Sequence, residues 1–161
     1  NFQRIVSVGA FEHFGRKFYK TFFKKINNIM TDDGICLLHT IGSIEPPGAV
    51  QPFIQKHVFP GGVVPSLSEL ISPIEKTGLI LADCETLIHH YDKTLKAWLD
   101  RFLKNKNKAK FLYNKEFVRM WECYLSMCSA AFKFKDLVVY QLQLVKNFTA
   151  PPSNRRNYIY Q

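Results

Sequence analysis

An acidic side chain and an imidazole side chain follow two apolar segments of the chain, each close to the point where its segment ends. Residues 2–8 form a short apolar run that stops at Gly9, and Glu12 follows three residues later. His39 lies near the end of a second apolar run over 35–41. Such runs predict buried strands, and ligands bind where the carboxyl ends of parallel strands meet. Glu12 and His39 are therefore predicted to converge there, for acid–base catalysis or to hold an anion.

Each of these residues also has an ordinary structural interpretation. Glu12 could be a carboxylate at a helix N-terminus, stabilised by the helix dipole. His39 could be a hydrogen-bonded histidine of the core. Tyr91 opens a predicted helix after a third apolar strand, near the same edge, where a tyrosine more often packs than reacts. The residues by themselves leave these alternatives open.

The cysteines and glycines carry no familiar cofactor signature. Cys36, Cys84, Cys123 and Cys128 lack CxxC spacing and do not cluster with histidine, so we expect no metal site. A disulfide framework would be unusual in a lysine-rich chain without an apolar leader, which indicates a reducing compartment. GxGxxG, P-loop and GxSxG motifs are also absent from the sequence. A glycine-rich cofactor turn follows the first strand of a sheet, so we expect it upstream of Asn1.

The hydrophobic pattern predicts an α/β domain. The helix predicted over 15–31 lies between strands that lack alternation, which is typical of a parallel sheet covered on both faces. Asp32-Asp33-Gly34 is predicted to be the turn that leads into the second strand. The remaining predicted elements are an irregular stretch over 43–65, helices over 66–78, 91–103 and 116–132, strands over 79–87 and 137–145, and a solvated lysine-asparagine connector over 104–110.

Length, composition and charge limit the class of protein. The chain has 161 residues, enough for one domain, with 47% hydrophobic and 22% charged residues, close to globular averages. No apolar run approaches ~18 residues, so we expect no membrane span. The net charge of +9 favours nucleic acid, anionic lipid or phosphorylated metabolites as partners, although it could serve solubility alone. Aromatic residues, 14% of the chain, fit either a dense core or an enclosed acyl or aromatic ligand.

Five segments, in order along the chain, carry a resemblance to a known family. They are SVGAFEHFG, LLHTIG, HVFPGG, YDKTL and RMWECYLSMCSAAF. Over residues 2–147 the chain resembles the cyclopropane-fatty-acid synthases, including the mycolic acid cyclopropane synthases, which are S-adenosylmethionine-dependent methyltransferases. The resemblance implies the C-terminal half of a Rossmann-like methyltransferase fold, a mostly parallel sheet with an antiparallel last strand. Residues 1–147 would be the C-terminal part of the methyltransferase domain, and 148–161 a loose tail.

The resemblance implies a reaction and a set of site residues. Family members transfer the sulfonium methyl group to a cis double bond of a lipid acyl chain, a carbocation forms, and loss of a proton from the new methyl group closes the ring. A bound bicarbonate serves as the base, and the resemblance implies that Glu12, His39, Tyr91 and the backbone near Ile41 hold it. Cys128 falls on a cysteine of the family's active site, although a carbocation route needs no thiol.

The resemblance also bears on the co-substrate, the product and the location. Val8 matches a position whose backbone touches S-adenosylmethionine. We expect a cytoplasmic enzyme, peripheral to the membrane, that acts on unsaturated phospholipid acyl chains at the membrane surface and has no nucleic-acid partner. A homodimer is left open, as is a methyl-branched product in place of the ring. Since the chain starts inside a strand and without Met, we expect a fragment that lacks the cofactor loop and is inactive alone.

Two other functions remain as alternatives. The first is a non-catalytic basic module that keeps part of the fold and binds lipid or nucleic acid. The second is a methyltransferase with an unrelated small-molecule acceptor. A glycine-rich loop upstream of Asn1 would favour the enzyme, and an initiating Met close to Asn1 would favour the module.

Overall fold

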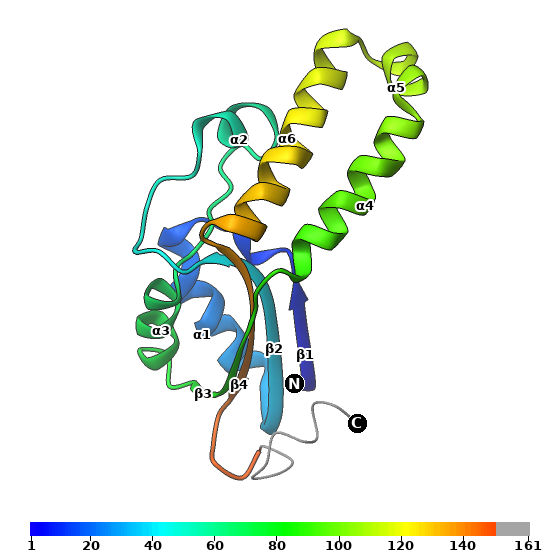
Figure 1. Ribbon diagram of the computed structural model, residues 1–161. Helices are drawn as coiled ribbons and strands as arrows, with labels where there is room; N and C mark the ends of the chain where they lie inside the picture. The colour runs from blue at the N-terminus through cyan, green and yellow to red at the C-terminus, as the bar shows by residue number, and fades with distance from the viewer. Residues whose placement is uncertain (151–161) are drawn as a thin grey trace.

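The computed structural model describes residues 1–150, which form a four-stranded mixed sheet (Figure 1). Its strands are β1 (Phe2–Val8), β2 (Met30–Ser43), β3 (Ile80–Leu87) and β4 (Leu137–Val145), in the order β1-β2-β4-β3. β1 runs parallel to β2, whereas β4 is antiparallel to both of its neighbours. The predicted α/β fold with an antiparallel last strand is thereby confirmed.

Helices cover the sheet and extend beyond one end of it. β1 leads into two short 3-10 helices, η1 (Phe11–His13) and η2 (Arg16–Phe18), and then α1 (Tyr19–Ile29). Between β2 and β3 lie α2 (Pro52–His57) and α3 (Leu67–Glu75), and between β3 and β4 lie α4 (His90–Lys104), α5 (Lys106–Leu112) and α6 (Lys115–Phe134). We call α4, α5 and α6 the arm. α4 and α6 pack against each other and rise beyond the carboxyl end of β1, with α5 at the far end (Figure 1).

Two hydrophobic cores lie on opposite faces of the sheet. The first joins Leu38 of β2 and Leu142 of β4 to α1 and α3. The second joins Val139, on the other face of β4, to Leu95 of α4 and Leu125 of α6. Successive side chains of a strand point to opposite faces, so the odd-numbered residues of β2 share the face of the second core. The arm therefore covers this face at the carboxyl end of β2.

The turn predicted at Asp32-Asp33-Gly34 is wrong, because these residues lie inside β2. The pairing of β1 with β2 shifts from Phe2 opposite Met30 to Arg4 opposite Ile35, so the polar residues form an irregularity within a continuous strand. A side chain at Gly34 would bring its Cβ within 2.3 Å of Met30 Cγ. Glycine is needed there for close approach and not for a turn.

The solvated connector predicted over 104–110 is also wrong in part, because most of it is helical. α5 covers Lys106–Leu112, and Lys106 Nζ lies 2.8 Å from a Glu122 carboxylate oxygen on α6. Lysine and alanine are good helix formers, so the segment continues the helical arm once α6 is present to pack against it. Most of the predicted tail, residues 151–161, lies outside the described residues. Every helix within residues 1–150 is too short or too polar to span a lipid bilayer.

Candidate functional site

Glu12 lies where the sequence predicted it, just past the carboxyl end of β1, and its side chain turns toward β2. The Ile41 N–H donates to Glu12 Oε1 at 2.7 Å, and the Glu12 carbonyl accepts from the Val63 N–H at 2.8 Å. The carboxylate thus joins η1 to β2 and does not cap its own short helix. Glu12 Oε2 is buried and has no hydrogen-bond partner among the described residues. A buried carboxylate oxygen without a donor is costly unless a ligand supplies one.

His39 takes part in a row of side chains that runs across the sheet. It lies opposite Val8 on one side and Gln141 on the other, and Gln141 lies opposite Glu85. His39 Nδ1 is 3.2 Å from Gln141 Oε1, and Gln141 Nε2 donates to Glu85 Oε2 at 2.9 Å. A carboxylate can only accept, so the amide nitrogen faces Glu85 and the amide oxygen faces the ring. Nδ1 therefore carries the proton, and Nε2 is the nitrogen left for a ligand.

Tyr91 and Cys128 join Glu12 from the base of the arm. His89, with φ of 61°, turns the chain from β3 into α4 and brings Tyr91 to the first turn of that helix. Burial raises the pKa of Tyr91, and the neighbouring Glu12 and Cys128 raise it further. At neutral pH the Tyr91 hydroxyl therefore keeps its proton and can donate it in a hydrogen bond.

Cys128, on α6, is mostly buried, and burial raises the pKa of its thiol to about 11. The thiolate is the nucleophilic form of cysteine, and it is nearly absent at neutral pH with such a pKa. Cys128 is thus suited to packing and to a neutral contact with a ligand. It is not suited to nucleophilic attack.

Aromatic rings surround the Tyr91 side chain. Its ring centroid lies 5.0 Å from that of Phe132 and 6.0 Å from that of Trp98. Tyr124, whose pKa burial raises to about 12, packs against Trp121 at 5.1 Å. Phe132 and Tyr124 are buried and Tyr91 is half-buried. The cluster offers apolar surface for contact with an acyl chain, and ring faces beside Glu12 that can attract a cation.

Val8 ends β1 opposite His39, and its side chain is 63% exposed. β1 is the edge strand of the described sheet, and the following Gly9, at φ of 63°, donates its N–H to the His39 carbonyl at 3.1 Å. The structure therefore brings Glu12, Ile41, Tyr91 and Cys128 together at the arm base, with His39 and Val8 along the neighbouring sheet row.

The sequence reasoning missed Gln141 and Glu85. Their signal was available in part, because Gln141 and Gln143 interrupt LVVYQLQLV, which is otherwise a largely apolar strand. A polar residue inside such a strand must find a hydrogen-bond partner across the sheet. Which partner it finds depends on the strand order, and the sequence does not contain that order.

Comparison with known proteins identifies the family. The family model described as mycolic acid cyclopropane synthetase matches residues 1–142, which is most of the chain. The chain belongs to this family.

Curated and solved members of the family resemble the chain over most of its length. The cyclopropane-fatty-acyl-phospholipid synthase of Escherichia coli K12 is 39% identical over 141 residues, covering 88% of this chain and 37% of that protein. The structure of the cyclopropane synthase MmaA2 from Mycobacterium tuberculosis superposes with a TM-score of 0.82 at 32% identity, covering 88% of this chain and 54% of the other. A structure of the mycolic acid cyclopropane synthase CmaA1, complexed with SAH and CTAB, gives a TM-score of 0.81 at 32% identity. The chain thus spans about half the length of these relatives, or less.

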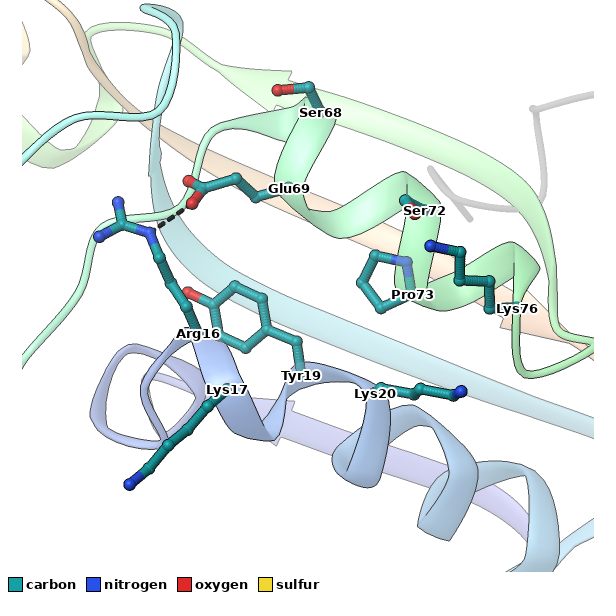
Figure 2. Close-up of a pocket in the computed structure, with 9 residues that line it drawn as sticks. All are labelled: Arg16, Lys17, Tyr19, Lys20, Ser68, Glu69, Ser72, Pro73 and Lys76. Atoms are coloured by element: carbon teal, nitrogen blue, oxygen red, sulfur yellow. Dashed lines mark hydrogen bonds and ion pairs between the residues drawn. The ribbon is translucent and has the colours of Figure 1, made fainter.

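A groove between α1 and α3 lies away from this site, on the face of the sheet that the first core occupies (Figure 2). Its volume is about 320 Å³, and basic and hydroxyl side chains line it. Arg16 forms an ion pair with Glu69 (Figure 2), and it also donates to the Gly48 carbonyl at 2.7 Å. Glu69 in turn accepts from the Ser66 N–H at 2.9 Å, which forms the capping box that starts α3. These contacts anchor the loop that carries Val63, and hence the backbone of Glu12.

Proposed function

We propose that the whole protein transfers a methyl group from S-adenosylmethionine to the cis double bond of an unsaturated phospholipid acyl chain and forms a cyclopropane ring. The observation that carries this proposal is the buried, unpartnered Glu12 Oε2, which faces the same site as Tyr91 at the carboxyl edge of the sheet. An acceptor of this kind suits a small ligand that is itself a hydrogen-bond donor. Family membership supports the reaction class.

The residues present fit bicarbonate, which would supply the base that removes a proton from the transferred methyl group. Glu12 Oε2 would accept the hydrogen bond of the bicarbonate hydroxyl. The Tyr91 hydroxyl, held neutral by its raised pKa, would donate to a bicarbonate oxygen. Neither residue needs to change its ordinary protonation state to do so.

His39 would help to position the ligand. Because Nδ1 donates to Gln141, whose amide donates in turn to the Glu85 carboxylate, the ring is held in one orientation and its Nε2 is left for the ligand. Ile41 would act through Glu12, since its N–H already holds Oε1 and so directs Oε2. Cys128 would line the site as a neutral thiol.

The edge strand β1 offers a place for the co-substrate, which supplies the methyl group to be transferred. Val8 is exposed at the carboxyl end of this strand, beside the row that contains His39. Its backbone would contact S-adenosylmethionine.

The aromatic cluster would receive the acyl chain. Tyr91 lies beside Glu12, and the rings of Phe132 and Tyr124 lie beside Tyr91. Positive charge on the reacting carbons would be attracted to these ring faces. Because its substrate would be a membrane phospholipid, the enzyme would work at a membrane surface, on the cytoplasmic side. A homodimer stays a prediction.

The test uses the full-length protein with S-adenosylmethionine that carries a radioactive methyl group. Two sets of phospholipid vesicles serve as acceptors, one with cis-unsaturated and one with saturated acyl chains. We expect label in the fatty acids of the unsaturated lipid only. Label in the saturated lipid, in the headgroups or in no lipid at all would overturn the proposal.

A further inference from the structure

The far end of the arm concentrates positive charge. Residues 101–115, which we call the arm tip, contain Arg101 and five lysines and no acidic residue. All six cationic side chains are exposed. Lys106 is paired with Glu122, which fastens α5 to α6 and leaves the other five without an ion pair within the described residues. A stretch this basic attracts an anionic surface over roughly a Debye length, ~8 Å at physiological salt.

The arm tip also exposes a run of bulky apolar side chains. Phe111 is 89% exposed, Leu112 62% and Tyr113 65%. None of the three belongs to either hydrophobic core, and only the Tyr113 ring stacks, on Phe117 at 4.3 Å. Scattered exposed apolar residues are ordinary, but three in succession inside a cationic segment form an amphipathic patch.

The position of the arm tip separates it from the catalytic residues. Tyr91 lies in the first turn of α4. α4 begins at the sheet, whereas α5 lies at the opposite end of the arm (Figure 1). The 15 residues of α4 carry the chain about 22 Å along the helix axis. Changes at the arm tip therefore leave the contacts of Glu12, His39 and Tyr91 in place.

We propose that the arm tip is a docking site for an anionic phospholipid bilayer. Lysine stems can lie along the apolar boundary while their ammonium groups reach the lipid phosphates. Phe111 and Leu112 would enter the upper acyl region, and Tyr113 would sit at the headgroup level, where aromatic residues with a polar end are favoured. The cationic side chains would also suit nucleic acid, but Leu112 has no aromatic ring on which a base could stack. The inference deepens the proposed function and rests on it for the phospholipid substrate.

The test measures binding of the full-length protein to sedimented vesicles, without turnover. One set of vesicles contains phosphatidylcholine alone and the other equal parts of phosphatidylcholine and phosphatidylglycerol. The test variant is Lys104→Gln/Lys108→Gln/Lys110→Gln, which keeps the Lys106–Glu122 pair. The matched control, Lys20→Gln/Lys24→Gln/Lys25→Gln, removes the same charge from exposed lysines of α1.

Each lysine near an anionic surface contributes roughly a fivefold gain in partitioning, so the test variant should bind the anionic vesicles on the order of 100-fold more weakly. The control should stay within about threefold of the wild type, and salt near 1 M, where the Debye length is about 3 Å, should release all three proteins. Phe111→Ser/Leu112→Ser should weaken binding at low salt as well.

Equal losses of vesicle binding in the two triple variants would show that only the net charge matters, and the proposal that the arm tip is the docking site would be wrong. Unchanged vesicle binding of the test variant, with loss of its binding to duplex DNA, would reassign the surface to nucleic acid and also overturn the proposal. Thermal unfolding of each variant checks that the fold is retained. Because no turnover is measured, failure here is distinct from failure to methylate the lipid.

Discussion

Glu12→Gln isolates the one atom on which the proposed base site depends. Glutamine keeps an oxygen that can accept from the Ile41 N–H, so the link between η1 and β2 is retained. It replaces the buried Oε2 by an amide group that donates and cannot accept. Bicarbonate then loses the acceptor for its hydroxyl and meets two protons in its place.

The size of the effect follows from the strength of that contact. A hydrogen bond to a charged group contributes about 1.5–3 kcal/mol, and every 1.4 kcal/mol is about tenfold, so bicarbonate should bind about 10- to 150-fold more weakly. The free energy of unfolding should stay within about 1 kcal/mol of the wild type, because an amide nitrogen without a hydrogen-bond partner replaces a carboxylate oxygen without one.

The assay is steady-state methyl transfer by the full-length protein at graded bicarbonate, in buffer first depleted of carbon dioxide. At low bicarbonate Glu12→Gln should be slow, excess bicarbonate should restore much of the rate, and the KM for S-adenosylmethionine should not change. Glu45→Gln, at an exposed glutamate of the loop after β2, is the matched control and should behave as the wild type. A normal rate at low bicarbonate, or a loss confined to the KM for S-adenosylmethionine, would refute the reasoning.

Three other substitutions test neighbouring parts of the account. Tyr91→Phe removes one hydroxyl, so methyl transfer should slow, and added bicarbonate should partly restore its rate. The free energy of unfolding should change by no more than about 1 kcal/mol. Full activity without added bicarbonate would show that Tyr91 is not part of the site. Gln141→Leu deprives His39 Nδ1 of its acceptor, so the ring is no longer held in one orientation and methyl transfer should slow. An unchanged rate would assign Gln141 a packing role only. Gly42→Ala would bring a Cβ within 2.2 Å of the Tyr140 ring and 3.0 Å of the Pro65 carbonyl, so urea unfolding should show a loss of about 1–3 kcal/mol, and an unaltered midpoint would contradict that packing.

Much of the fold was predictable because its elements have strong local signals. Gly9 ends β1, the Ser66–Glu69 pair starts α3, and the apolar run of β4 has the length of a strand. The errors occurred where tertiary contacts override local chemistry. Asp32-Asp33-Gly34 looks like a turn in isolation, but pairing with β1 holds it inside β2.

The candidate site was predictable only in outline. The rule that ligands bind at the carboxyl ends of parallel strands selected Glu12 and His39 from position alone. Tyr91 and Cys128 entered through the family resemblance, since neither spacing nor composition brings α4 and α6 to Glu12. Gln141 was beyond both approaches, because its contact with His39 exists only once β4 lies between β2 and β3.

The proposed function requires that a base held at this site remove a proton from a methyl group delivered to a lipid double bond. It is tested most directly with S-adenosylmethionine whose methyl group is fully deuterated, the full-length protein and cis-unsaturated phospholipid, followed by mass spectrometry of the released fatty acids. We expect cyclopropane fatty acids that retain two of the three deuterium atoms, formed at a rate that falls in Glu12→Gln and recovers with bicarbonate. Fatty acids that retain all three deuterium atoms would contradict it.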